Sequence, residues 1–250
     1  MRRDISCVVP LHAEGLLAHK TVRSIKRAAS CLERFGLSVE FVFVLDRPTP
    51  ETMCYVETSP VIAPGCKLIS ADLGDAGLAR NLGVQHAEGE YIAIHDGDDL
   101  TSENWLLRAY ELNRLDRRYV VHPEVTVAFD QKTYVVYHPD QRLRDLADVD
   151  IVFENCWPYI CFSRRETFLE VPYTATPKSS GFGYEDWHWN CEVMASGFIH
   201  TLALGTVFLN RLKESGSRFV EQSTRNTVIP HSALLDENEK RHIVRNGAAR

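Results

Sequence analysis

The chain has 250 residues, of which 44% are hydrophobic and 25% charged, and its formal net charge is −6. These are ordinary values for a globular chain long enough to bury a substantial core, and the negative charge gives no support to general nucleic-acid binding. No apolar run approaches the roughly 18 residues that a membrane-spanning helix needs.

The amino terminus and the cysteines favour an intracellular location. The first residues lead directly into an apolar strand, unlike a secretion signal. The seven cysteines include no Cys-x-x-Cys pair, and their odd number is incompatible with a complete set of disulfides. We therefore expect a cytoplasmic protein with reduced thiols. Peripheral association with the inner face of a membrane, through the polar tail or a partner, is left open.

Predicted strands and helices alternate through the first hundred residues. Apolar runs predict strands at 5–10, 40–45, 66–69 and 91–94, and patterns of helical period predict helices at 18–32, 49–56 and 75–87. Within the last of these helices Ala79, Gly83 and Ala87 recur every fourth residue, so this helix can approach a sheet closely. Successive strand–helix units indicate a mainly parallel sheet with right-handed crossovers.

The second half of the chain is richer in β-type segments. Runs at 119–122, 125–129 and 133–137 predict strands, the last two forming a hairpin, and 150–165 is a further apolar segment. Residues 174–183 are rich in Gly, Ser, Thr and Pro and predict a mobile loop. A helix is expected over 185–194, with a buried side made of Trp187, Cys191, Met194 and Phe198. The last thirty residues are polar and of mixed charge, a candidate helical tail.

Three carboxylates lie just after the predicted strand at 91–94. Asp96, Gly97, Asp98 and Asp99 are consecutive, and the glycine lets the backbone turn where the strand ends. Ligands of open α/β sheets bind at this edge of the sheet. All-oxygen clusters suit Mg²⁺ or Mn²⁺ shared with substrate phosphates. An isolated motif of this kind could equally be a solvated acidic turn.

Five segments in order carry a family resemblance. They are Pro10-Leu-His-Ala-Glu14, Leu45-Asp-Arg-Pro-Thr49, the helix-to-strand segment from Ala79 to Ile92, Asp96-Gly-Asp-Asp99 and Gly183-Tyr-Glu-Asp186. Together they resemble the family 2 glycosyltransferases of the GT-A fold over roughly residues 4–220.

The resemblance implies an α/β, Rossmann-like fold and a division of the chain. We expect a mostly parallel central sheet with helices on both faces, and a smaller mixed sheet on the acceptor side. Residues 1–220 would form the glycosyltransferase domain, with 1–100 as the nucleotide-sugar-binding half and 101–220 as the acceptor and catalytic half. Residues 221–250 would form the polar tail.

The resemblance also assigns residues to the sugar-nucleotide donor. Asp46 would accept a hydrogen bond from the base, with a helix or turn cap as its alternative role. His12 would stack on the base in place of the family's tyrosine, Glu14 would bind the ribose or base, and Arg80 would neutralise the diphosphate. Pro10, Gly97 and Lys213 complete the expected donor site.

Mg²⁺ or Mn²⁺ is the implied cofactor, held by Asp98 directly and by Asp96, with Asp99 as a possible orienting residue. Asp186 is the implied general base, which takes the proton of an acceptor hydroxyl during an inverting displacement. The alternative for Glu185 and Asp186 is a simple pair of acids at a helix amino terminus. The reaction implied is hexosyl transfer from a nucleoside-diphosphate sugar to a saccharide or glycolipid in surface polysaccharide assembly.

Three departures from the family pattern affect donor preference. The second segment lacks its first acid and has Arg47 after Asp46, and His188 stands where another acid is common. The segment Asn210-Arg-Leu-Lys213 occupies the region of the family's basic Arg-x-His segment, so Lys213 would replace the histidine as a phosphate contact. Glu185, Trp157 and Trp187 are acceptor-side candidates, although the tryptophans could equally belong to the core.

Two rival functions come from other classes. One is a catalytically silent module that binds nucleotide sugars or acts as a scaffold, and retention of Asp96, Asp98 and Asp186 argues against it. The other is a metal phosphohydrolase built on His95 and Asp96, which lacks further ligands at metal spacing. His86, His122 and His138 are expected to be structural or exposed.

Overall fold

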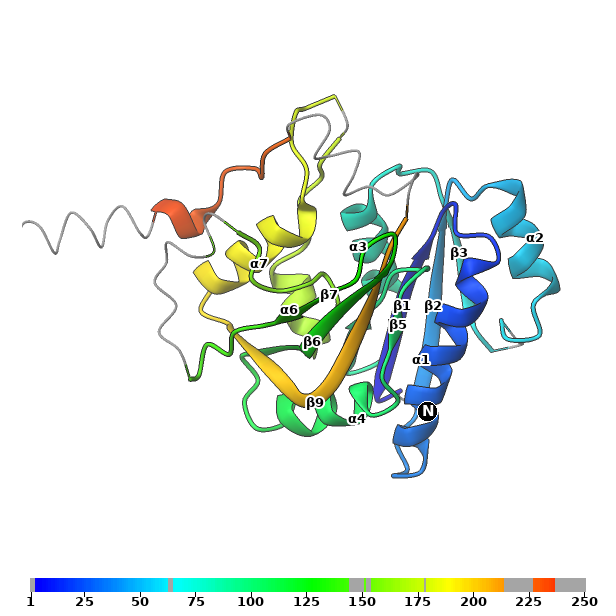
Figure 1. The fold of residues 1–250 in the computed structure, drawn as a ribbon, viewed down its shortest axis with the longest axis horizontal. Coiled ribbons are helices and arrows are strands. Elements are labelled where there is room, and N and C mark those ends of the chain that lie inside the picture. The colour runs from blue at the N-terminus through cyan, green and yellow to red at the C-terminus, as the bar shows by residue number, and fades with distance from the viewer. Residues whose placement is uncertain are drawn as a thin grey trace, which may run out of the picture.

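The computed structural model describes residues 3–62, 65–143, 151, 154–177, 179–213 and 227–236. Its helices are α1 (Leu17–Glu33), α2 (Pro50–Thr58), α3 (Ala76–His86), α4 (Trp105–Asn113), α6 (Arg165–Glu170) and α7 (Glu185–Ala195) (Figure 1). The strands are β1 (Ile5–Leu11), β2 (Val39–Asp46), β3 (Lys67–Ala71), β4 (Tyr91–Ile94), β5 (Leu100–Thr101), β6 (Tyr119–Asp130), β7 (Tyr134–Tyr137), β8 (Cys161–Arg164) and β9 (Ile199–Leu212).

The described strands form one sheet in the order β3-β2-β1-β4-β8-β6-β9-β5, with β7 paired to β6. The strands β3, β2, β1 and β4 are parallel, as the alternation of strands and helices predicted. Antiparallel pairing of β4 with β8 then begins a mixed half of the sheet. The predicted α/β fold is confirmed, and the expected acceptor-side sheet is continuous with the parallel one.

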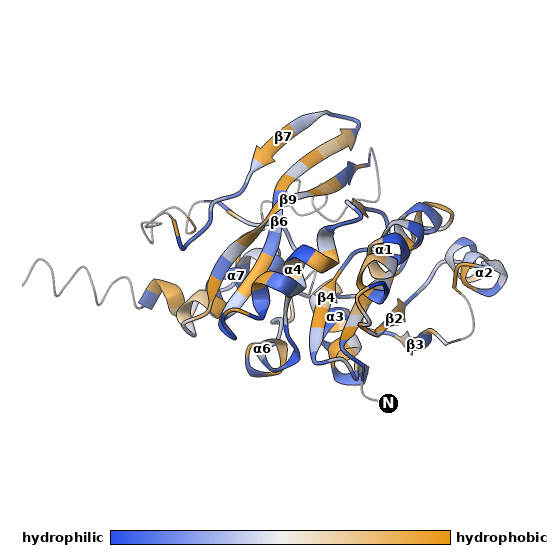
Figure 2. Cartoon of the chain, turned by 90° about the horizontal axis from the view of Figure 1, so that it is seen from below, coloured by the Kyte–Doolittle hydropathy of each residue, from blue (hydrophilic) through white to orange (hydrophobic). Residues whose placement is uncertain are grey.

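Helices cover both faces of the sheet, because successive side chains of a strand point to opposite faces. One cluster joins α1 and α4 to residues such as Cys7 and Val9 of β1. The other joins α3, α6 and α7 to Val8 of the same strand. The view from below in Figure 2 separates α1 from α3 and α6 across the sheet.

The close approach predicted for α3 is present at Gly83. A Cβ atom on this residue would lie 2.3 Å from Cγ1 of Val8, so only glycine fits between helix and strand. The helix begins at Asp75, whose Oδ1 accepts a hydrogen bond from the backbone N–H of Leu78 at 3.0 Å. The helix is thereby held against the sheet with its first turn near the carboxyl ends of the strands.

The long strand β9 is bent in the middle (Figure 1). Gly205 has a φ of 74°, a left-handed conformation that glycine adopts readily, and the pairing with β6 shifts register between Pro123 and Val125. After the bend the strand pairs with β5, which follows the acidic turn. The bend therefore brings Lys213 back to the end of β4.

Several second-half predictions need correction. The runs at 119–122 and 125–129 form the single strand β6, whereas the hairpin with β7 is confirmed. Helix α7 is buried on more sides than predicted, because Trp189 and Val193 pack on one cluster and Cys191 on another. Trp187 and Met194, placed on the buried side by the sequence, are only partly buried.

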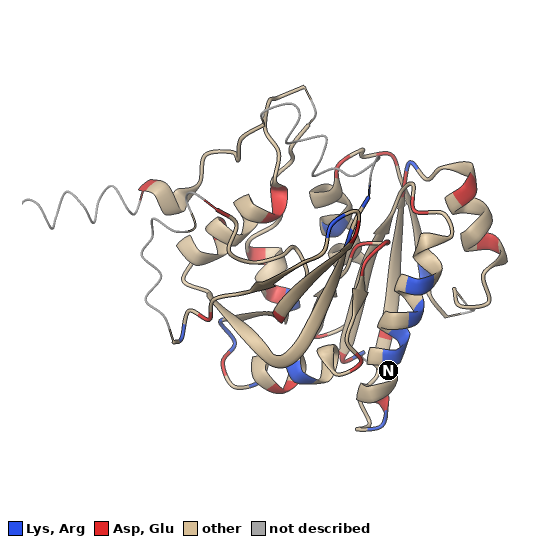
Figure 3. Cartoon of the chain, in the orientation of Figure 1, with Lys and Arg blue, Asp and Glu red and all other residues tan. Residues whose placement is uncertain are grey.

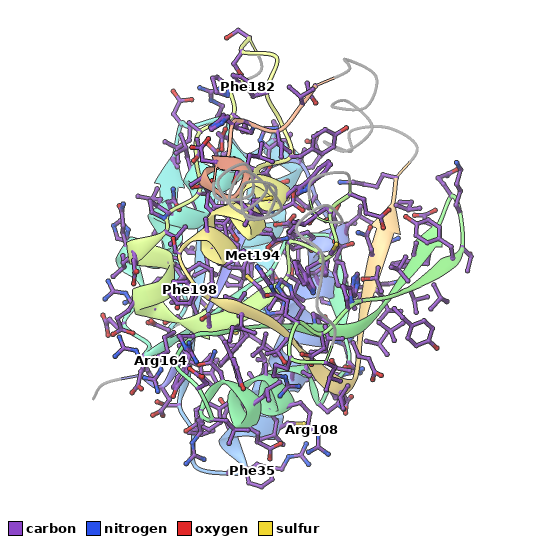
Figure 4. The ribbon with its side chains drawn as sticks, turned by 90° about the vertical axis from the view of Figure 1, so that its left-hand side faces the viewer. Phe35, Arg108, Arg164, Phe182, Met194 and Phe198 are labelled. Atoms are coloured by element: carbon purple, nitrogen blue, oxygen red, sulfur yellow. The ribbon has the colours of Figure 1, made fainter. Side chains whose placement is uncertain are left out.

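The described part of the tail packs on the domain. The backbone N–H of Gly183 donates to the carbonyl of Val228 at 2.9 Å, and Leu234 is buried beside α7. Figure 4 shows Phe182 at the upper end of the molecule, with Met194 and Phe198 below it. The packed chain thus continues beyond residue 220, where the sequence predicted the tail to begin. Residues 221–226 and 237–250 of the expected tail lie outside the described residues, as do 144–150, 152–153, Lys178 and 214–220.

Two further expectations concern cysteines and membrane spans. All seven cysteines lie in the described residues, and none of them is in a disulfide bond. Within those same residues, no helix has both the length and the apolar character needed to cross a membrane.

Candidate active site

The predicted site residues gather at the carboxyl edge of the parallel strands. His12 and Glu14 follow β1, Asp46 ends β2, and the acidic turn 96–99 follows β4. Because β1 lies between β2 and β4, the three strand ends are neighbours. Acidic and basic segments come together at this edge in Figure 3.

Gly97 lets the acidic turn pack directly on the segment after β1. A Cβ atom there would lie 2.5 Å from Cδ2 of Leu11 and 2.9 Å from Cγ of Glu14. Any side chain would push the turn away from these residues. Burial raises the pKa of Glu14, and the nearby charge of Asp98 raises it further.

Asp99 is held by two donors from distant parts of the chain. The Tyr159 hydroxyl donates to its Oδ2 at 2.6 Å, and the backbone N–H of Arg211 donates to its Oδ1 at 2.6 Å. Burial and the charge of Asp98 raise the pKa of Asp99 well above its usual value. These contacts suit Asp99 to an orienting role, as the sequence suggested.

Asp98 forms an ion pair with Lys213. The lysine Nζ lies 2.5 Å from Oδ2 of Asp98, and the two side chains are only 22% and 15% exposed. Burial lowers the pKa of Lys213, but Asp98 and Glu14 raise it by more, so the amine is held as a cation. The sequence paired both residues with the donor diphosphate, and the structure brings them together.

Arg80 is enclosed beneath the turn. Its guanidinium donates to both carboxylate oxygens of Asp96, at 2.9 and 3.0 Å, and to Glu185 at 3.0 Å. The rings of Tyr159 and Tyr173 lie 5.1 and 5.4 Å from its Cζ, and Arg80 is 1% exposed. The predicted contact of Arg80 with a diphosphate is thus replaced by two carboxylate contacts, because the arginine is sealed from the surface.

Asp186 lies in the first turn of α7, next to Glu185. Tyr184 before it has a φ of 55°, a strained conformation for a residue with a side chain. The side-chain amide of Asn155 donates to Oδ2 of Asp186 at 3.0 Å. Burial and the charge of Glu185 raise the pKa of Asp186 to about 6. A carboxyl that titrates near neutral pH is well suited to accept a proton.

Asp46 has the cap role that the sequence left as an alternative. Its carboxylate accepts backbone hydrogen bonds from Leu73, Gly74 and Asp75 at 2.7, 3.0 and 3.2 Å. The exposed ring of His12 lies beside it, with Nδ1 2.8 Å from the Asp46 carbonyl oxygen. Contact of either residue with a nucleotide base stays a prediction.

The three acceptor-side candidates differ in how deeply they are buried. Trp157 is 1% exposed and stacks on His200 with ring centroids 4.1 Å apart, so neither ring face is open to a sugar and its acceptor role is wrong. Glu185 is buried against Arg80. Trp187 is partly exposed and donates from Nε1 to the Ile151 carbonyl at 2.6 Å, which leaves it as the remaining aromatic candidate.

Among the described residues, the histidines weighed for a phosphohydrolase do not come together as a metal site. His95 is 2% exposed, its Nε2 has no hydrogen-bond partner among the described residues, and burial lowers its pKa to about 3. His122 is buried against His200, whereas His86 is exposed and its Nδ1 lies 2.9 Å from the Leu82 carbonyl oxygen. His138 is partly buried, with Nδ1 2.8 Å from the Cys156 carbonyl oxygen.

Sequence reasoning missed four residues that organise the site. They are Asn155, Tyr159, Tyr173 and Arg211, and each binds or covers one of the predicted acids or Arg80. The sequence offered a signal only for Arg211, which lies in the Asn210-Arg-Leu-Lys213 segment already compared with the family's basic motif. The other three come from loops whose proximity to the site depends on the fold.

Comparison with known proteins identifies the family. The family described as Glycosyl transferase family 2 matches residues 6–170. Two structures of S. aureus TarS 1-349 are similar in fold, each with 15% sequence identity and covering 96% of this chain and 72% of that one. The TM-scores are 0.59 for the complex with UDP and 0.55 for the other structure. No curated protein sequence matches the chain. Because the family match spans well over half of the sequence, the chain belongs to glycosyl transferase family 2.

Proposed function

We propose that this protein transfers a sugar from a nucleoside-diphosphate sugar to a hydroxyl group of a saccharide or glycolipid. Family membership supports glycosyltransferase activity. The observation that carries the proposal is the link through Arg80, which ties Asp96 of the donor-side turn to Glu185, the neighbour of Asp186. One buried residue thus links a carboxylate expected on the donor side to the neighbour of the proposed base.

The donor would lie over the carboxyl ends of β1, β2 and β4. His12 is exposed beside Asp46, where its ring can stack on a base. Pro10 and Glu14 border the same edge, and Lys213 is the cation available to a diphosphate. UDP is the nucleotide present in one similar structure, which makes uridine diphosphate the first candidate.

Asp186 would act as the general base of an inverting displacement. It would take the proton from the acceptor hydroxyl as that oxygen bonds to the anomeric carbon. The bond between that carbon and the diphosphate oxygen breaks at the same time, and the nucleoside diphosphate leaves. Attack from the face opposite the leaving group inverts the anomeric configuration.

The expected Mg²⁺ or Mn²⁺ at Asp98 and Asp96 stays a prediction. Such an ion would neutralise charge on the departing diphosphate, but Asp98 and Asp96 are already bound by Lys213 and Arg80 in the structure, so no step of the proposed transfer depends on it. The setting that we propose is hexosyl transfer in surface polysaccharide or glycolipid assembly at the cytoplasmic side, by analogy with the family.

A nucleotide panel tests this function. Thermal unfolding of the full chain would be measured with UDP, GDP, dTDP, ADP and CDP, each with Mn²⁺ present. Binding to the folded state alone raises the unfolding temperature by mass action. We expect one nucleotide to raise it and the matching sugar nucleotide to do the same. A panel without any shift would contradict the proposal.

A further inference from the structure

The ion pair between Lys213 and Asp98 occupies the place expected of a metal. Nζ of Lys213 lies 2.5 Å from Oδ2 of Asp98, the residue that the sequence predicted to ligate a divalent ion directly. Both side chains are largely buried, so the pair is a fixed part of the site and not a surface contact. Lys213 follows directly on β9, whose bend returns the chain to the acidic turn.

The other carboxylates of the turn also have protein donors. Asp96 receives both of its hydrogen bonds from Arg80, and Asp99 receives one from Tyr159 and one from Arg211. Among the described residues there is no group of three His, Cys, Asp or Glu side chains that could hold a metal ion. A protonated lysine is a donor and cannot ligate a cation. The described residues around this turn therefore do not fit a divalent ion.

We propose that the ammonium group of Lys213 supplies the positive charge that faces the donor diphosphate, so that the nucleotide binds without a divalent cation. This inference rests on the proposed function. A lysine ammonium is a compact charge with three donors on a flexible stem, which suits contact with phosphate oxygens. Asp98 then holds and orients this cation.

A second cation lies in the same segment. The Arg211 guanidinium donates to the Asp98 carbonyl at 3.2 Å and to Asp130 at 3.1 Å, over the ring of Phe129. The Arg211 guanidinium is thus held by these contacts, and it anchors the end of β9. Lys213 has a single acidic partner among the described hydrogen bonds and ion pairs, so it can turn its remaining donors towards a ligand.

Calorimetric titration of the full chain with UDP, and with GDP and dTDP in parallel, tests the proposal in EDTA and in Mn²⁺. We expect the parent chain to bind one nucleotide with dissociation constants that agree within about threefold in the two buffers, a difference well under 1.4 kcal/mol. Lys213→Met should weaken binding in EDTA by about tenfold or more, the loss expected for one charge-assisted hydrogen bond. Lys20→Met, which removes an exposed lysine of α1, is the matched control and should leave binding unchanged.

A second variant, Lys213→His, tests the same proposal in a different way. Asp98 and a neutral imidazole together can ligate Mn²⁺, so this variant should bind the nucleotide weakly in EDTA and regain affinity with Mn²⁺. It also keeps the test decisive if Lys213→Met fails to fold, which the unfolding temperature without nucleotide would reveal.

The outcomes separate the two proposals. Binding by the parent chain only in the presence of Mn²⁺ would overturn the role of Lys213 and leave the glycosyltransferase function in place. Equal affinity of Lys213→His and parent in EDTA would also overturn it. If no nucleotide binds in either buffer, the proposed function falls and this inference with it.

Discussion

At the scale of single residues, the proposed role of Asp186 as the general base makes sugar transfer depend on its protonation state. Burial and Glu185 raise its pKa to about 6, so the carboxylate form needed for proton transfer is lost as the pH falls through that value. We expect kcat/KM to level off above about pH 7 and to fall about tenfold per pH unit below about pH 6. A rate constant that stays flat down to pH 5 would contradict the role of Asp186.

Asn155 is a positioning residue for Asp186. Its amide donates to the carboxylate at 3.0 Å, which stabilises the ionised form. In Asn155→Ala this donor is lost, so the pKa of Asp186 should rise and the acid limb of the pH–rate profile should move to higher pH. Asn155→Ser keeps a hydroxyl that can donate to Asp186, so it should move the acid limb by less than Asn155→Ala does. Asn104→Ala, at a partly exposed asparagine whose side-chain amide donates to the Gly205 carbonyl, is the control for which no movement of the acid limb is expected.

At the scale of elements, the packing of α3 on the sheet depends on Gly83. Alanine there gains about 1 kcal/mol of helix propensity, but its Cβ would lie 2.3 Å from Val8. Overpacking of a core typically costs about 1–3 kcal/mol. We expect Gly83→Ala to lower the free energy of unfolding, measured by denaturant titration. Gln85→Ala, at an exposed position of the same helix, should have almost no effect, and equal stability of Gly83→Ala and parent would refute the packing argument.

The elements of the first half could be predicted from sequence because each is specified locally. The strands β1 and β2 are short apolar runs buried on both faces, and α3 carries its own capping residue in Asp75. The strand β9 escaped prediction, because it bends at Gly205 and is defined by its pairing with β6 and β5. For the same reason the sequence could place Lys213 only by resemblance.

In the candidate site, too, residues specified locally could be predicted and residues brought in by long-range contacts could not. The acids at the ends of β2 and β4 could be read from the sequence, since a strand end fixes where they lie. Their partners could not, because Tyr159 and Asn155 reach them from segments far along the chain. Burial of Trp157 in the core was equally hidden, since an aromatic residue in a loop can face either way.

At the scale of the whole molecule, buried histidines should govern stability in acid. Burial lowers the pKa values of His95 and His200 to about 3, so the unfolded chain binds these protons more readily than the folded one. Stability contributed by neutral histidine is present above pH 6.5 and is lost as the pH falls below it, by about 2 kcal/mol per residue at pH 5. Burial also lowers the pKa values of His122 and His138, which add to this loss. The carboxyls whose pKa is raised in the fold work in the opposite direction: they are Glu14, Asp96, Asp99 and Asp186, of which Asp186 contributes about 1 kcal/mol over this range.

The free energy of unfolding should therefore decrease between pH 7 and pH 5. Denaturant titrations at several pH values measure it directly. In His200→Gln the slope should be shallower than in the parent chain, whereas removal of the exposed His86 should leave the slope unchanged. A stability that is constant or rises over this range would show that these histidines do not remain neutral in the fold.

The central claim is sugar transfer with Asp186 as the base, and the most direct measurement compares the parent chain with Asp186→Asn. The substitution keeps the shape of the side chain and an oxygen that can accept from Asn155. With the sugar nucleotide identified by the panel and a set of saccharide acceptors, the sugar–acceptor product would be quantified by mass spectrometry and donor affinity by calorimetry. We predict that transfer falls by about 10²–10⁴-fold while the donor dissociation constant stays the same. Transfer by Asp186→Asn at the parental rate would contradict the account.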